Sequence, residues 1–268
     1  MRKIICLLCF VLIALILPAQ EEQAQEEQEN RDARSEYYSN GNIKAETSFD
    51  EEGKKHGIWS EWYISGTKKS EKEYSHDIKT GKWTEWYENG QEKSKGNYVN
   101  DRKDGKWSEW YENGQGKSSR EYINGINTGT WLEWNDNGQR TTMIVFFDSG
   151  GKKQESTFRY NMDIATETYT EWSEHGNKKI EQRLVGGKRH GPYKEWYGNG
   201  NPSIETNYRD GLEDGLHKDW YENGNLRMES EMKNGKRDGF TTFRNEEGVI
   251  QWRQEYRDGQ FIRRVPIY

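Results

Sequence analysis

The sequence predicts an all-β protein, an elongated antiparallel meander of β-hairpin repeats that forms a ribbon or solenoid. Three observations predict this fold. Eleven of the 12 tryptophans fall into two columns with a spacing of mostly 24 residues, inside the phrase G-x-W-x-E-W-Y-x-N-G. A tight-turn pair, most often Asn-Gly, closes each phrase, and it is a strong hairpin signal because both residues tolerate positive φ. Eight residues after each turn glycine comes an apolar residue, as a buried column requires.

The columns define the repeat. The first tryptophan column is Trp59, Trp83, Trp107 and Trp131, and the second is Trp62, Trp86, Trp110, Trp134, Trp172, Trp196 and Trp220. The apolar column is Phe49, Tyr74, Tyr98, Tyr122, Phe146, Leu184, Tyr208, Met232 and Tyr256. Each repeat is therefore expected to be two short strands, joined by a tight turn and followed by a looser one such as Asn100–Gly105.

The composition fits a thin sheet with aromatic faces. Only 31% of the 268 residues are hydrophobic, whereas 13% are aromatic. Aromatic side chains bury roughly 150–250 Å² each and replace the aliphatic core of a globule. The net charge of -6 argues against nucleic acid as a partner.

The N-terminal segments differ from the repeats. Residues 1–19 have Arg2 and Lys3 before an apolar run from Ile4 to Leu17, which is typical of a secretory signal peptide. An uncleaved anchor is the alternative, although 14 apolar residues are too few to span a bilayer, which needs roughly 20. Residues 20–35 are rich in Glu and Gln and are interpreted as a linker. Both cysteines, Cys6 and Cys9, lie in the apolar run, so the mature chain is expected to contain none.

The repeat array is expected to cover residues 36–268, with a break near 139–165. Turn glycines recur every 24 or 25 residues up to Gly138, and the next matching one is Gly176. The interval contains Met143–Gly151, the most aliphatic stretch outside the N-terminal run. An extra strand, an inserted partial repeat or a junction between two sub-arrays would each explain it.

Two hairpin registers are open. A two-residue Asn-Gly turn places Glu85 opposite Ser94, on the face of Trp83 and Tyr98. A three-residue turn with a glycine bulge places Glu85 opposite Lys93 and groups Trp86 with Tyr98. We favour the second register because opposite charges directly across a strand pair contribute roughly 0.2–1 kcal/mol.

In either register, the two tryptophans of a repeat point to opposite faces because their spacing is odd. With the second column assigned to the core, the first column is the candidate partner-binding surface. Its members Trp59, Trp83, Trp107 and Trp131 either pack against neighbouring repeats or form an exposed aromatic row that binds a protein, peptide or glycan.

An acidic column lies beside these tryptophans. Glu61, Glu85, Glu109 and Glu133 are included in the candidate surface, and Glu171, Glu195 and Asp219 continue the column. The column is interpreted as a salt-bridged outer face, with a cation ladder or a surface for a basic partner as the alternative. Catalysis is disfavoured because successive members lie about 10 Å apart and are equivalent to one another.

No other motif indicates chemistry. The five histidines are interpreted as polar turn residues rather than ligands, and HExxH and GxSxG motifs are absent. The protein is therefore expected not to be an enzyme and to need no cofactor or metal.

The phrases GKWTEWYENGQ (81–91) and GKWSEWYENGQ (105–115) resemble the variant MORN repeat of bacteria, and the resemblance covers about residues 36–268. It implies stacked β-hairpins in an elongated sheet. Many bacterial members are catalogued as YwqK-type antitoxins, although an N-terminal secretion signal departs from an intracellular antitoxin.

We therefore expect a secreted or periplasmic scaffold of the cell envelope that binds another protein. After signal cleavage it would have no stable membrane anchor, and its edge strands would permit self-association. An antitoxin of a toxin–antitoxin system is the alternative function, and a glycan-binding or glycan-active envelope protein is a third.

Overall fold

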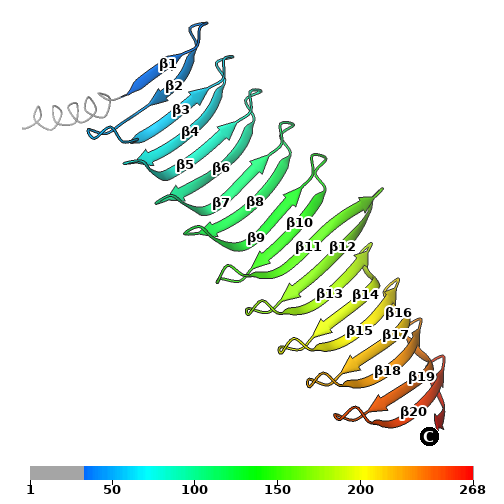
Figure 1. Cartoon of the computed structure of the whole chain (residues 1–268). Helices are drawn as coiled ribbons and strands as arrows, with labels where there is room; N and C mark the ends of the chain where they lie inside the picture. The colour runs from blue at the N-terminus through cyan, green and yellow to red at the C-terminus, as the bar shows by residue number, and fades with distance from the viewer. Residues whose placement is uncertain (1–32, 268) are drawn as a thin grey trace, which may run out of the picture. The chain divides into compact units, whose positions relative to one another are not determined.

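The computed structural model describes residues 33–267, and all its regular elements are β-strands. They form one open antiparallel sheet of 21 strands, consecutive along the chain (Figure 1). This confirms the predicted all-β hairpin meander. The predicted signal segment lies outside the described residues, as does the linker up to residue 32. The first strand starts at Arg34, two residues before the predicted beginning of the array.

Two compact units divide the described chain, one up to Gly105 with Glu112–Gly114, the other Lys106–Tyr111 and from Gln115 onward. The strands before Arg102 are β1 Arg34–Tyr37, β2 Ile43–Thr47, β3 Gly57–Trp62, β4 Lys68–Ser75, β5 Ile78–Trp86 and β6 Glu92–Val99. The remaining strands are β7 Arg102–Trp110, β8 Gly116–Ile123, β9 Ile126–Trp134, β10 Arg140–Phe146, β11 Lys152–Asn161, β12 Ile164–Trp172, β13 Lys178–Val185, β14 Lys188–Trp196, β15 Pro202–Arg209, β16 Leu212–Glu213, β17 Gly215–Trp220, β18 Leu226–Lys233, β19 Lys236–Arg244, β20 Ile250–Arg257 and β21 Gln260–Val265.

The Asn-Gly turns have the geometry that the sequence favours. Tyr87 donates its N–H to Gln91, and Gly90 donates its N–H back to the Tyr87 carbonyl at 3.0 Å. Gly90 has φ of 87°, so a three-residue turn ends in a glycine bulge, a conformation that favours glycine. The Asn89 side chain accepts the Gln91 N–H at 3.0 Å and holds the loop.

Beyond the turn, the favoured register is wrong. Trp86 pairs with Glu92, but the register then shifts and Glu85 pairs with Ser94, which leaves Lys93 as the extra residue of a second bulge. The same shift recurs in β3–β4, β12–β13, β14–β15 and β17–β18. Because a one-residue slip exchanges the faces, Trp83 rather than Trp86 shares a face with Tyr98.

From β4 onward, the second turn of each repeat is tighter than predicted. His76 and Asp77 have φ of 52° and 68°, and Asn100 and Asp101 have 49° and 64°, so each pair forms a two-residue hairpin turn. The following strands start at Ile78 and Arg102. Gly105, which the sequence assigns to the turn, lies inside β7 with φ of 74°.

The 139–165 interval contains one additional strand. β10 pairs with β9 on one side and with β11 on the other, and Gly150 closes the β10–β11 turn in the same way as Gly90. Phe146 lies eight residues after Gly138, which is the position of the apolar column. It also lies four residues before Gly150, which is the position of the second tryptophan column. The same strand therefore serves two repeats, which explains why its side chains are so apolar.

The additional strand exchanges the faces of the sheet. Trp131 pairs with Ile144, which pairs with Glu155 and then Thr170. Tyr169, the counterpart of Trp131 in the next repeat, therefore lies on the other face, in the row of Leu132, Met143 and Ser156. The additional strand also reverses the chain direction. The Gly-closed turns after Gly138 therefore lie at the opposite ends of the strands from the Gly138 turn.

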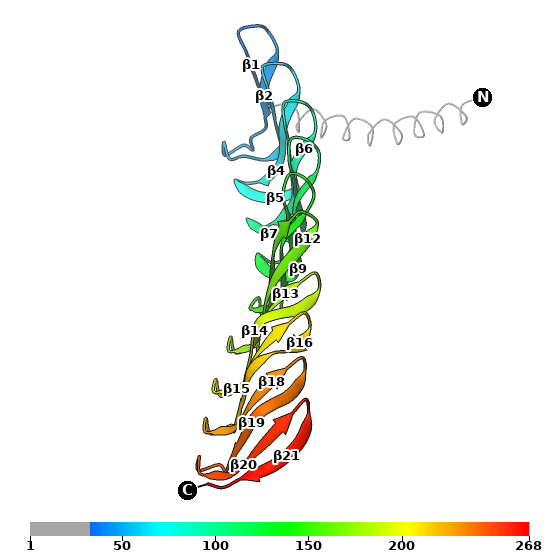
Figure 2. The same cartoon turned by 90° about the vertical axis from the view of Figure 1, so that its right-hand side faces the viewer.

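The interior is thin, as the composition predicts. Tyr122, Phe146 and Tyr193 are the buried large apolar residues in the described chain. Among the smaller side chains, Ser70, Ser156, Ser230 and Thr241 are almost fully buried. Each unit is a single layer of strands in both views (Figures 1 and 2). Ring stacking along a face therefore replaces a core between layers.

Candidate interaction surface

The first tryptophan column is packed into an aromatic row. The Trp83 ring lies 5.5 Å from Tyr74 and 4.7 Å from Tyr98, and Trp131 lies 5.3 Å from Tyr122 and 4.8 Å from Phe146. Such tilted and edge-to-face pairs contribute roughly 0.5–1.5 kcal/mol beyond their buried area. Burial raises the pKa of the Tyr74 and Tyr122 hydroxyls.

Hydrogen bonds fix the same tryptophans to the backbone of the preceding strand or of the residue directly after it. The indole N–H groups of Trp59, Trp83 and Trp131 donate to the carbonyls of Ser48, Glu73 and Glu121, at 2.8, 3.2 and 3.2 Å. All four members, Trp107 included, are half-buried. The prediction that this column faces outward, away from the Tyr98 series, is therefore wrong.

Cations lie over the aromatic row. The Lys55 ammonium is 4.5 Å from the centre of the Trp59 ring, and the Lys79 ammonium is 5.1 Å from that of Trp83. Arg189 lies 4.5 Å from Tyr193 in the same position of a later repeat. Cation–π attraction holds these side chains on the rings, so the row presents positive groups to solvent.

The acidic column lies on the same face as these tryptophans. Lys72 lies between Glu61 and Glu85, at 3.9 and 3.8 Å, and Arg120 lies between Glu109 and Glu133, at 3.7 and 2.8 Å. The four carboxylate side chains are 32–45% exposed. The result is a row of alternating charges beside half-buried rings, which we call the acidic face.

The basic column after the turns also reaches these acids, although it is not directly opposite them. Lys117 lies 3.4 Å from Glu109, Lys179 lies 2.7 Å from Glu171, and Arg227 contacts Asp219 at 2.9 Å. Each cation is the extra residue of the second bulge or its counterpart. The charge pairing that the sequence indicates therefore exists, but as a diagonal contact in the other register.

The second tryptophan column lies on the opposite face. The Lys68 ammonium sits between Trp62 and Trp86, 5.7 and 5.9 Å from their ring centres. A tyrosine follows five of the seven tryptophans, and these tyrosines form a ladder that sequence reasoning missed. The Tyr63 hydroxyl donates to the Trp86 carbonyl at 2.9 Å, and the Tyr197 hydroxyl donates to the Trp220 carbonyl at 2.6 Å. The recurring Trp-Tyr pair in the repeat phrase, which is absent at Trp134 and Trp172, is the signal for it.

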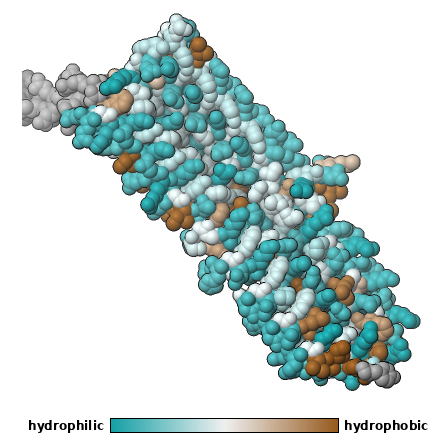
Figure 3. All heavy atoms as spheres, in the orientation of Figure 1, coloured by the Kyte–Doolittle hydropathy of each residue, from teal (hydrophilic) through white to brown (hydrophobic). Residues whose placement is uncertain are grey.

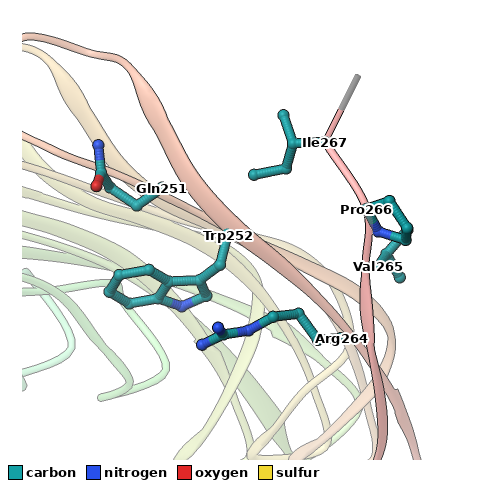
Figure 4. A pocket seen from close by; sticks show the side chains of 6 residues that line it. All are labelled: Gln251, Trp252, Arg264, Val265, Pro266 and Ile267. Carbon is teal, nitrogen blue, oxygen red and sulfur yellow. The ribbon is translucent and has the colours of Figure 1, made fainter.

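Apolar side chains gather at the C-terminal strands (Figure 3). Trp252, Phe261 and Ile262 are exposed there. A depression of about 360 Å³ is lined by Trp252, Arg264, Val265, Pro266, Ile267 and Gln251 (Figure 4). Arg264 lies over the Trp252 ring, 5.9 Å from its centre. This lining has no acid–base pair, so it offers a packing surface rather than a catalytic site.

Two predicted turn histidines meet in space, which the sequence did not indicate. His56 and His76 are in edge-to-face contact, with ring centres 4.9 Å apart. Asp50, from the irregular segment between β2 and β3, lies beside them. His190 and His217 instead face a single acid each, Asp210 at 3.6 Å and Glu213 at 3.4 Å.

The fold and the rows of equivalent residues define a repeat scaffold. The model of the MORN repeat variant matches five segments, which support a MORN-repeat protein. The matched segments are residues 33–54, 79–100, 103–124, 189–210 and 213–234.

Other comparisons add little. No curated protein matches the chain. A solved structure titled "Crystal Structure of TcdB2-TccC3-Cdc42" is similar over 84% of this chain and 13% of that chain, with 10% identity and a TM-score of 0.16. Among residues 33–267, no helix is long and apolar enough to cross a membrane.

Proposed function

We propose that this protein is a non-enzymatic repeat scaffold that binds another protein through its acidic face. The observation that carries the proposal is the repetition of one small set of groups, a half-buried ring, an acid and a cation, in equivalent positions. Successive copies on alternate strands lie about 10 Å apart. A partner with its own regular spacing can contact several copies, and each contact adds to the same binding energy.

The pairing of the acids supports a binding role over catalysis. Glu61 accepts a hydrogen bond from Ser70 at 2.9 Å and faces Lys72. Glu85 has partners of the same kind, Ser94 at 3.3 Å and the same Lys72. Two carboxylates with the same kind of partners are not differentiated into a general acid and a general base, which catalysis by such a pair requires.

A face-specific substitution tests the proposal. Glu61→Gln with Glu85→Gln removes two charges from the acidic face, where these side chains are 45% and 41% exposed. Glu71→Gln with Glu92→Gln is the matched control, since these acids lie on the opposite face and are 40% and 37% exposed. Both variants change the net charge equally.

The readout is the affinity for a partner identified by crosslinking to the wild-type chain. We expect the first variant to weaken binding at least about tenfold, which corresponds to about 1.4 kcal/mol. The control should bind as the wild type does. Equal weakening by both variants, or an unchanged affinity for the first, would contradict binding through this face.

The proposal also includes export and an antitoxin role. The charged and apolar N-terminal segment supports secretion to the cell envelope or beyond. The resemblance to YwqK-type antitoxins supports a cognate toxin as the partner. Co-expression with the product of a neighbouring gene tests this role. Suppression of that product's toxicity would identify the antitoxin, and unrelieved toxicity would exclude it for that gene pair.

A further inference from the structure

Asp50, His56 and His76 form a cluster with the donor chemistry of a transition-metal site. One ligand atom from each residue lies within 4.8 Å of the other two, and the described residues contain no other such group of three. The His76 Nε2 atom lies 3.7 Å from the Asp50 Oδ2 atom. The residues come from the segment between β2 and β3 and from the β4–β5 turn, which lie at the same edge of the sheet.

The Asp50 carboxylate is oriented toward the histidines. Its Oδ1 atom accepts the backbone N–H groups of Glu52 and Lys54, at 2.9 and 2.8 Å. Its Oδ2 atom is buried and has no hydrogen-bond partner. A carboxylate oxygen is thus buried beside two imidazoles without a hydrogen-bond donor.

The two histidines are positioned to complete the set. The Ser75 hydroxyl lies 3.2 Å from the His76 Nδ1 atom. A hydrogen bond there leaves Nε2, the atom that faces Asp50, as the ligand atom. The segments that carry the histidines are held together, because Lys55 donates its N–H to the Asp77 side chain at 2.9 Å and Asp77 donates its N–H to the Lys55 carbonyl.

This cluster departs from the repeat. The position of His56 is occupied by Thr80 in the next repeat, and the position of His76 by Asn100. A turn that needs only positive φ does not require histidine, since Asn100 has φ of 49°. The His190 position has a histidine too, but its neighbour is a single carboxylate.

We propose that Asp50, His56 and His76 bind one Zn²⁺ ion. Two imidazoles and one carboxylate are ligands that zinc accepts, and three protein ligands leave a fourth position for water or a partner's side chain. Tetrahedral zinc needs ligand atoms about 3.4 Å apart. Both histidines are exposed, so small rotations of their side chains close the remaining gap.

The test replaces both histidines with the residues that occupy the same positions in the next repeat. His56→Thr with His76→Asn installs the pair found in the next repeat, so the variant should fold as the wild type does. His190→Thr is the matched control, because it makes the same change at the same repeat position. The purified full chain, without an affinity tag that binds metal, is titrated with ZnCl₂ by calorimetry, and imidazole NMR signals are followed.

We expect the wild type to bind one equivalent of Zn²⁺, with shifts in the signals of His56 and His76. The double variant should bind at least about a hundredfold more weakly, since loss of ligands costs more than loss of their supporting hydrogen bonds, which is 10–100-fold. The His190→Thr control should bind like the wild type. A wild type that takes up no Zn²⁺, or a double variant with the same affinity, would overturn the site.

Discussion

The repeats before and after the additional strand β10 differ in the hydrogen bonds made at the position of the first tryptophan column. Before it, Trp59, Trp83 and Trp131 donate to a backbone carbonyl in the preceding strand or, for Trp59, in the residue directly after it. After it, the Tyr169 hydroxyl donates to Glu171 two residues away in its own strand, at 3.0 Å, and Tyr193 donates to Glu195 in the same way. Tryptophan therefore links neighbouring strands, whereas tyrosine orients its own acid. Ring stacking also continues after β10, since the Tyr193 ring lies 5.6 Å from that of Tyr208.

The junction between the two regions shows how a half repeat reorganises the surface. β10 carries Val145 at the position that an acid occupies in other repeats, so the acidic column ends there. It resumes at Glu171 on the other face of the sheet. A protein that binds the acidic column would therefore contact one face of the sheet before β10 and the opposite face after it.

Deletion of residues 137–148 is expected to have the largest effect, because it places Gly150 at the repeat position of Gly138. One strand is lost, and the acids of both regions then share a face. Glu133→Cys and Gln154→Cys should form a disulfide in the deletion variant, since their strands become neighbours. In the full chain β10 separates these strands, so no disulfide should form. The opposite pattern of disulfides would contradict the assigned repeat phase.

Truncation of Trp131 tests the stack in the first region. Trp131→Ala removes ring contacts with Tyr122 and Phe146 and should destabilise the surrounding strands by about 3 kcal/mol. Trp131→Tyr, which installs the residue of the later repeats, should cost less than half of that. Hydrogen exchange of β8–β10 amides measures both values. Equal losses would show that ring stacking contributes little.

The charge pairs should differ between the regions because their burial differs. Arg227 donates two hydrogen bonds to Asp219, at 2.9 and 3.0 Å, and the Asp219 side chain is 9% exposed. Arg227→Gln should cost about 2 kcal/mol, since it leaves a buried carboxylate with fewer donors. Lys117→Gln should cost about 0.5 kcal/mol, since Glu109 is 32% exposed. Urea unfolding of both variants measures the difference, and similar costs would contradict it.

A smaller effect is expected for the pH dependence of the stability that the Lys179–Glu171 pair contributes. The hydrogen bond from Lys179 lowers the pKa of Glu171 below 4.5, although burial opposes this shift. A lowered carboxyl pKa stabilises the fold above the unfolded value, and that stabilisation is lost as the pH falls through the folded value. Lys179→Gln should therefore destabilise the protein by a few tenths of a kcal/mol at pH 7 and by less at pH 3. A cost that does not change with pH would show that the pair is not ionic.

Sequence periodicity predicted the hairpin meander, the Gly-closed turns and the opposite faces of Trp83 and Trp86. It did not predict the register, because a bulge at Lys93 adds one unpaired residue without a residue type that marks it. The prediction that the basic column pairs with the acidic column is confirmed for Glu109 and Glu171. The prediction that a lysine lies directly opposite Glu85 is wrong, because Ser94 occupies that position. The approach of Asp50 to His56 and His76 depends on an irregular segment, which periodicity does not describe.

The exchange of faces at β10 is tested most directly by the β10–β11 register. Residues 33–268 contain no cysteine, so paired cysteines can be introduced without competition. Met143→Cys with Ser156→Cys joins directly paired residues and should oxidise readily to a disulfide. Ile144→Cys with Ser156→Cys joins residues on opposite faces and should stay reduced. Oxidation of the second pair and not of the first would keep Trp131 and Tyr169 on one face and contradict the exchange.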